Sequence, residues 1–179
     1  MLANLMRSST HSSMTEVVIC GLDELEAVMT KTQAECAITL LGPGMETPAV
    51  IAAVDHLRFS FDDTVDIRHP EAPTLEAIRR LVSEGSELLK RAAESKKPLV
   101  IHCHGGICRS TAAALILLSE WNDPLDAMRT VLRIRQEADP NMLMCQLADQ
   151  VFGGSLLEEA VQWAQPEISR RFIERHELE

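Results

Sequence analysis

The segment that most restricts how this chain can fold is an apolar run that leads into a turn with two glycines and then into a second apolar run. Residues 99–103 (LVIHC) are largely apolar on both faces, as in the central strand of a sheet covered on both sides. Residues 104–108 form the turn, and residues 109–121 are apolar nearly all round, which is typical of a buried helix. Together they predict a sheet with helices packed on it.

Short apolar runs with strand character alternate with longer segments of helical period along the rest of the chain. The expected strands are residues 16–20, 37–41, 56–61 and 99–103. The expected helices are residues 23–33, 74–95, 109–121, 124–138, 141–152 and 156–175. Gly85 weakens the second helix, and Pro166 kinks the last one or ends its first part. Residues 49–54 stay unassigned, because this run is apolar but short.

This order of elements predicts an α/β fold with a central, mostly parallel sheet flanked by helices and a helical C-terminal half. The chain has 179 residues, of which 46% are apolar and 25% charged, as in an ordinary globular protein. We expect residues 15–179 to form a single domain and residues 1–14 to form a flexible tail.

The charge balance argues against two classes of partner. There are 27 acidic and 17 basic residues, and the formal net charge is −10. A protein that binds by neutralising phosphates needs the opposite sign, so we expect neither nucleic acid nor a membrane surface as a partner.

The cellular location is inferred from what the chain lacks. No apolar run reaches the roughly 18 residues of a membrane span, and the first residues do not resemble a secretory signal. Five cysteines at irregular spacing indicate reduced thiols and a cytoplasmic protein. Those outside the glycine turn are expected to fill the interior. They are Cys20, Cys36 and Cys145.

Residues 102–111 (HCHGGICRST) have the composition of an anion site. A glycine turn at a helix N-terminus presents unpaired backbone N–H groups, and the helix dipole adds partial positive charge. The same groups would favour the thiolate of Cys103 and make it a nucleophile. Arg109 adds a planar fork that can hold two phosphate oxygens.

The stretch HCHGGICRS resembles the signature loop of the cysteine-dependent protein tyrosine phosphatase superfamily, whose pattern is His-Cys-x5-Arg-Ser. A second stretch, residues 133–147 (RIRQEADPNMLMCQL), resembles the segment that follows this loop in dual-specificity phosphatases. The resemblance covers roughly residues 57–152 and implies a protein tyrosine phosphatase-like fold and phosphatase activity.

The resemblance implies a role for each residue of the loop. Cys103 would take the phosphoryl group as a cysteinyl-phosphate, Arg109 would clamp that group, and Ser110 would hydrogen-bond the sulfur when it leaves. His102 would support the loop, and Asn141 would brace it from behind or merely cap the next helix. The implied substrate-binding positions are His104, Gly105, Gly106, Ile107, Cys108 and Arg109.

The same resemblance implies an Asp on a separate loop that protonates the leaving oxygen. We choose Asp63, with Asp62 and Glu71 as alternatives, because Asp63 follows the strand 56–61. We expect that strand to lie beside residues 99–103, so that the acidic loop overhangs the site. A solvated acidic turn is the other interpretation of these carboxylates.

The sequence therefore predicts an enzyme, a phosphomonoester hydrolase of the protein tyrosine or dual-specificity type. The expected substrate is a phosphorylated protein or a small phosphomonoester. The alternative is a module of the same fold that recognises phosphate without turning it over. A thiol redox protein that uses Cys103 and Cys108 is a third hypothesis. No cofactor and no metal are expected, since the histidines lack the short spacing of a zinc site.

Overall fold

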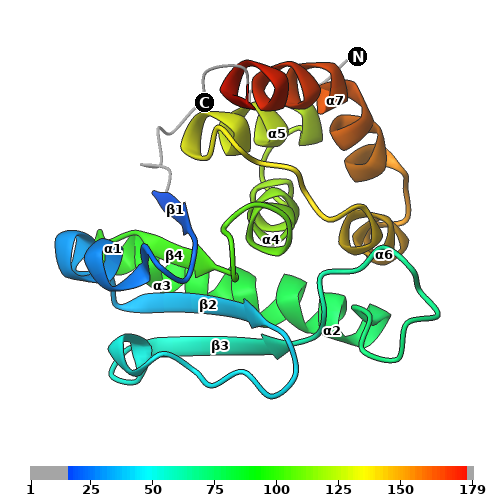
Figure 1. The fold of residues 1–179 in the computed structure, drawn as a ribbon. Coiled ribbons are helices and arrows are strands. Elements are labelled where there is room, and N and C mark those ends of the chain that lie inside the picture. The colour runs from blue at the N-terminus through cyan, green and yellow to red at the C-terminus, as the bar shows by residue number, and fades with distance from the viewer. Residues whose placement is uncertain (1–15, 177–179) are drawn as a thin grey trace, which may run out of the picture.

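The computed structural model describes residues 16–176 and contains a four-stranded sheet (Figure 1). The strands are β1 (Val17–Cys20), β2 (Cys36–Leu41), β3 (Asp55–Ser60) and β4 (Leu99–His102). Their order in the sheet is β1-β4-β2-β3, and every neighbouring pair is parallel. The predicted α/β class and parallel sheet are confirmed, whereas the predicted tail, residues 1–14, lies outside the described residues.

Helices make up most of the chain after β4, as the sequence predicts. The helices are α1 (Leu25–Thr32), α2 (Leu75–Arg80), α3 (Ser86–Ser95), α4 (Arg109–Leu118), α5 (Pro124–Ile134), α6 (Met142–Phe152) and α7 (Leu156–His176). Within residues 16–176, none of them has the length and hydropathy needed to cross a membrane. The last helix continues through Pro166.

The predicted helix 74–95 is one helical segment with a wider turn in its middle. The π-helical turn η2 (Leu81–Gly85) joins α2 to α3. A Cβ atom on Gly85 would lie 3.0 Å from Cδ2 of the buried Leu117, so glycine allows this turn to pack closely on α4. The unassigned segment 49–54 contains the 3₁₀ turn η1 (Ala49–Ile51).

Two helices end earlier than the sequence predicts. Asp123 accepts a hydrogen bond from the N–H of Leu125 and so caps α5, as expected. However, α5 ends at Ile134 instead of residue 138, because Arg135 has an extended backbone. Likewise α4 ends at Leu118 instead of residue 121.

The sheet has a thick cover on one face and a thin one on the other. The thin cover comes from α1 and η1, which pack on Cys20, Ala37 and Val100. The other face carries the main core, in which α4 contacts three strands as well as α5 and α6 (Figure 1). All ten residues of α4 are buried, as its sequence predicts.

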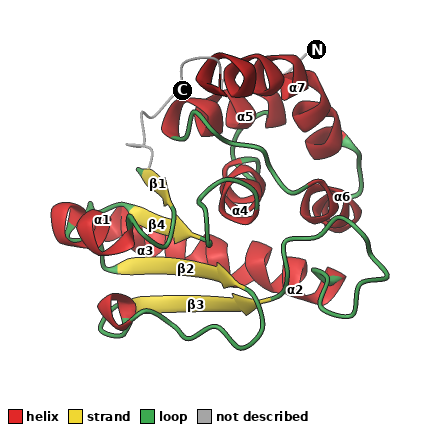
Figure 2. Ribbon diagram, in the orientation of Figure 1, coloured by secondary structure: helices red, strands yellow, loops and turns green. Residues whose placement is uncertain are grey.

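The expected position of β3 is wrong. β3 lies at the edge of the sheet and pairs with β2, so β2 separates it from β4. The long connection after β3, residues 61–74, has no regular structure and returns toward the helical layer (Figure 2). The acidic loop therefore approaches the end of β4 through this connection and not through strand pairing.

Candidate functional site

The glycine turn links the end of β4 to the start of α4 (Figure 2), and Cys103 stands at its beginning. Cys103 is only 1% exposed. The N–H of Gly106 donates a hydrogen bond to its Sγ at 3.2 Å, and Ser110 Oγ lies 3.3 Å from the same atom. The structure therefore brings together Cys103 and Ser110, as the sequence predicts.

The backbone of this loop turns its carbonyl groups outward. Four of its carbonyl oxygens accept hydrogen bonds from donors outside residues 103–108. The pairs are Leu22 N–H with His104 O (2.8 Å), Arg135 Nη2 with Gly105 O (3.3 Å), Asp139 N–H with Ile107 O (3.1 Å) and Asn141 N–H with Cys108 O (3.1 Å). A trans peptide points its C=O and its N–H in opposite directions, so the N–H groups that follow face the interior of the loop.

The N-terminus of α4 has no side-chain cap, in contrast to those of α2, α5 and α6. The side chains of Thr74, Asp123 and Asn141 cap α2, α5 and α6, whereas Cys108 makes no such bond at the start of α4. The unpaired N–H groups of the first turn and the helix dipole therefore favour an anion at this point.

Arg109 connects the loop to the end of the edge strand. Its side chain is 7% exposed, and its Nη1 donates to the carbonyl oxygen of Phe61 at 2.9 Å. Its Nε lies 3.5 Å from Asp63 Oδ2, an ion pair without the alignment of a hydrogen bond. The guanidinium thus stands between the signature loop and the acidic loop.

Asn141 holds Asp63 in this position. Its Nδ2 donates to Asp63 Oδ1 at 2.8 Å and to the carbonyl oxygen of Thr64 at 3.2 Å. Its Oδ1 accepts from the N–H of Met144 at 3.1 Å, which caps α6. The expected cap on α6 is therefore present, whereas the signature loop is held by the backbone N–H of Asn141 and not, as the resemblance implied, by its side chain.

The two alternative acids lie elsewhere. The side chain of Asp62 faces His69, with 3.9 Å between Oδ2 and Nδ1, and its N–H donates to the carbonyl oxygen of Glu71 at 2.8 Å. Of the three carboxylates considered, Asp63 is the one that forms an ion pair with Arg109 among the described residues.

The side chain of His102, at the end of β4, is buried and bonds within the sheet. Its Nε2 lies 2.7 Å from Oγ1 of Thr39, which in turn lies 2.7 Å from Nε2 of His56. The Thr39 hydroxyl has one hydrogen, so it donates to one histidine and accepts from the other. Burial lowers the pKa of His102 from 6.5 to about 4, and therefore His102 is neutral at pH 7.

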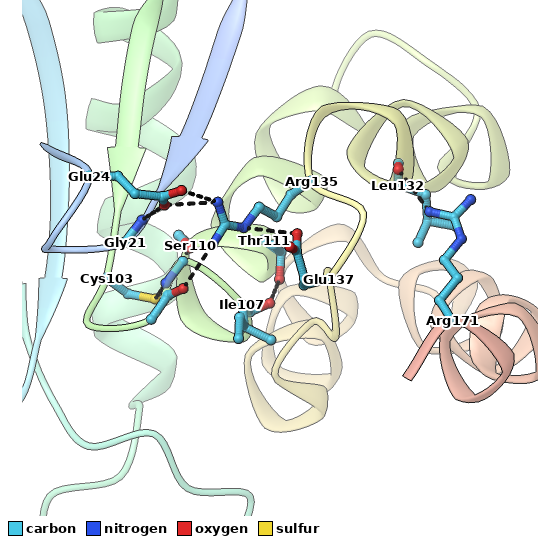
Figure 3. A network of polar contacts seen from close by, with 12 residues as sticks. Gly21, Glu24, Cys103, Ile107, Ser110, Thr111, Leu132, Arg135, Glu137 and Arg171 are labelled. Carbon is cyan, nitrogen blue, oxygen red and sulfur yellow. Dashed lines mark hydrogen bonds and ion pairs between the residues drawn. The ribbon is translucent and has the colours of Figure 1, made fainter. Parts of the chain in front are cut away.

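Arg135 and Glu24 brace the opposite side of the loop, and the sequence analysis did not find them (Figure 3). Arg135 Nη1 lies 2.9 and 2.8 Å from the two carboxylate oxygens of Glu24, and Glu24 accepts from the N–H of Gly21 at 2.7 Å. Arg135 Nε forms an ion pair with Glu137 at 3.3 Å. Arg135 lies within the predicted motif 133–147, but no local pattern links it to Glu24.

The loop contains a second thiol with different properties. Burial raises the pKa of Cys108 to about 12, and the negative charges of Asp63 and Asp139 act in the same direction. Cys108 thus stays protonated at neutral pH. Burial also raises the pKa of Cys20, which is close to the loop, to about 12.

Structural comparison relates this arrangement of sheet and helices to the fold of solved tyrosine and dual-specificity phosphatases. Human DUSP28 has a TM-score of 0.59 at 15% identity, over 82% of this chain and 93% of that chain. Cydia pomonella PTP-2 phosphatase has a TM-score of 0.57 at 17% identity, over 75% and 84%. The human tyrosine phosphatase-like serine/threonine/tyrosine-interacting protein has 0.55 at 16%, over 75% and 85%.

These likenesses define the fold of the chain. It has the fold of the dual-specificity and tyrosine phosphatases, and the predicted structural relation is confirmed at that level. By sequence, no protein-family model and no curated protein matches it.

We predict that Gly106→Ala destabilises the protein and that Gly105→Ala does not. Gly106 has a φ of +72°, and a Cβ there would lie 2.6 Å from backbone atoms of Cys20 and Gly21. A Cβ on Gly105 would be 3.7 Å from its nearest neighbour, which is ordinary contact. In urea unfolding, Gly106→Ala should cost about 2 kcal/mol or more, and Gly105→Ala less than about 0.5 kcal/mol. Equal costs would contradict the close packing of the loop on β1.

We also predict that His102 makes stability depend on pH. The pKa of His102 in the folded chain is lower than its ordinary value, so its contribution is complete above pH 6.5 and is lost as the pH falls toward about 4. The full loss is about 3 kcal/mol. Unfolding free energies at pH 7, 5.5 and 4 should fall less steeply in His102→Gln, and parallel profiles would refute the assignment.

Proposed function

We propose that the protein is a cysteine-dependent phosphomonoester hydrolase that works through a cysteinyl-phosphate intermediate. The observation that carries this proposal is the hydrogen bond from the N–H of Gly106 to the buried sulfur of Cys103. Because the carbonyl oxygens of the loop are held from outside, we infer that its other N–H groups form a ring around the same point. Such a ring of donors binds three phosphate oxygens and leaves the phosphorus atom next to the sulfur. The phosphatase fold of the structural neighbours supports the proposal.

The first step transfers the phosphoryl group to the enzyme. The thiolate of Cys103 attacks phosphorus, the S–P bond forms and the P–O bond to the leaving group breaks. We propose that Asp63 gives its proton to the leaving oxygen. Its position beside Arg109, where Asn141 holds it, supports this assignment over Asp62 and Glu71.

The second step returns the enzyme to its starting state. Asp63, now a carboxylate, accepts a proton from a water molecule that attacks phosphorus, and the S–P bond breaks. Ser110 Oγ, 3.3 Å from the sulfur, donates a hydrogen bond to the departing thiolate. Orthophosphate then leaves, and the loop's N–H groups with Arg109 hold its oxygens throughout. His104, Gly105, Gly106, Ile107 and Cys108 supply the backbone of this cradle. These steps use no cofactor and no metal.

We infer that the substrate is a phosphorylated protein, and that the protein acts in the reducing environment of the cytoplasm. All five cysteines are free, which suits such an environment. Phe59 and Phe61 are buried, so neither forms a stacking wall for a phosphotyrosine ring. The loop contains no lysine of the kind that a phosphoinositide would engage. The raised pKa of Cys108 disfavours the thiol redox hypothesis.

We predict that wild-type protein releases phenolate from an aryl phosphate and that Cys103→Ser does not. A rapid-mixing measurement should show a stoichiometric burst or steady turnover in the reduced wild-type protein. Loss of activity in Cys103→Ser but not in Cys145→Ser, which removes another buried thiol, would support the assignment. Absence of turnover together with vanadate binding would replace the proposal with a phosphate-recognition module.

We predict that Asp63→Asn lowers kcat by about 10²-fold to 10⁴-fold for a phosphate ester with a poor leaving group. A general acid must carry its proton, so wild-type activity falls as rising pH removes it, and this alkaline decline should vanish in Asp63→Asn. Asp62→Asn is the matched control, because its side chain faces His69. Assays of kcat against pH decide, and an unchanged alkaline decline in Asp63→Asn would refute the assignment.

A further inference from the structure

Exposed carboxylates stand at both ends of the signature loop. Near Gly105, Asp23 Oδ1 lies 2.6 Å from the point that a Cβ on Gly21 would occupy, and this point is 3.3 Å from the Gly105 backbone. At the other end, Asp139 donates its N–H to the carbonyl oxygen of Ile107, and Asp63 lies beside Arg109. The side chains of Asp23 and Asp139 take no part in the proposed chemistry.

The cations around the loop do not balance these charges. Arg135 touches the loop, but Glu24 and Glu137 already neutralise it (Figure 3). On the acidic loop, Arg68 pairs with Asp66, and His69 faces Asp62. Among the described residues, Arg109 therefore remains as the cation of the loop that meets a phosphate dianion.

These charges determine which groups beside the phosphate of a substrate are favoured. A phosphomonoester dianion brings two negative charges and Arg109 offsets one. The carboxylates of Asp23 and Asp139 stand near the two ends of the loop, while Asp63 carries its proton as the proposed general acid. The loop amides and the α4 dipole stabilise the phosphoryl group itself, but they do not reach groups bound around it. Groups that flank the phosphate are repelled when they are anionic and attracted when they are cationic.

We propose that these carboxylates select phosphomonoesters flanked by cationic groups, in particular a phosphorylated residue between lysines or arginines in a protein. This proposal rests on the proposed function, because it concerns the substrate of the same site. It also places phosphopeptides rich in acidic residues, and compact polyphosphates, among the poorest substrates.

Three phosphopeptides that share the phosphorylated residue and differ only in flanking lysines, serines or glutamates test this selection. Turnover of p-nitrophenyl phosphate, which has no flanking residues, is measured beside them. We expect kcat/KM to be at least tenfold higher for the lysine peptide than for the glutamate peptide at low salt. The ratio should shrink several-fold at 0.5 M NaCl, where the screening length is about 4 Å.

Charge-removing variants show whether the named carboxylates cause the selection. Asp23→Asn and Asp139→Asn should each reduce the lysine-to-glutamate ratio several-fold, with rates expressed relative to p-nitrophenyl phosphate. Glu94→Gln is the matched control. Glu94 lies near the end of α3, which leads into the start of β4, whereas the signature loop follows the opposite end of β4. Equal kcat/KM for the three peptides, or a ratio unaffected by both Asp variants, overturns the proposal.

The failure of the proposed function gives a different result. If neither p-nitrophenyl phosphate nor any peptide is turned over, the hydrolase assignment fails. The selection between peptides is then tested by calorimetry, which gives the dissociation constant of each peptide. A lysine peptide bound at least tenfold more tightly than the glutamate peptide supports the selection in a recognition module. Equal affinities, or no detectable binding, overturn it.

Discussion

The outward direction of the carbonyl groups in the signature loop is the constraint on which the site depends. Four donors from separate parts of the chain hold these oxygens, and the inward N–H groups are the geometric consequence. The turn after β1 supplies one donor, and the segment between α5 and α6 supplies the others. The proposed anion site thus forms only after residues far apart in sequence have come together, although its own residues are consecutive.

The sequence predicted the parts of the site that are local. A strand, a glycine turn and a buried helix follow one another directly, so Cys103, Arg109 and Ser110 could be placed from the sequence alone. The position of Asp63 was predicted for a wrong reason, namely that β3 would pair with β4. Instead β3 lies at the sheet edge, and the chain reaches the site through Phe61 and the loop after it. The order of parallel strands depends on long crossover connections, which the hydrophobic period does not encode.

Contacts between distant segments account for what the sequence analysis missed. Glu24 and Arg135 are 111 residues apart and meet because β1 and the end of α5 both pack beside the loop. Thr39 was the visible exception in an otherwise apolar strand, and its hydroxyl joins two histidines across the thinly covered face of the sheet. A buried polar group needs a partner, so such an exception marks a position worth examining even when the partner cannot be named.

Asn141 contacts three parts of the molecule whose relative positions matter for the proposed chemistry: the signature loop, the acidic loop and the start of α6. Its N–H holds the signature loop, its side-chain oxygen fixes the start of α6, and its side-chain nitrogen holds the acidic loop. The spacing between the proposed proton donor and the proposed nucleophile is consequently set by one residue that contacts both loops. An asparagine at this position therefore fixes the size of the group that fits between the sulfur of Cys103 and the carboxylate of Asp63.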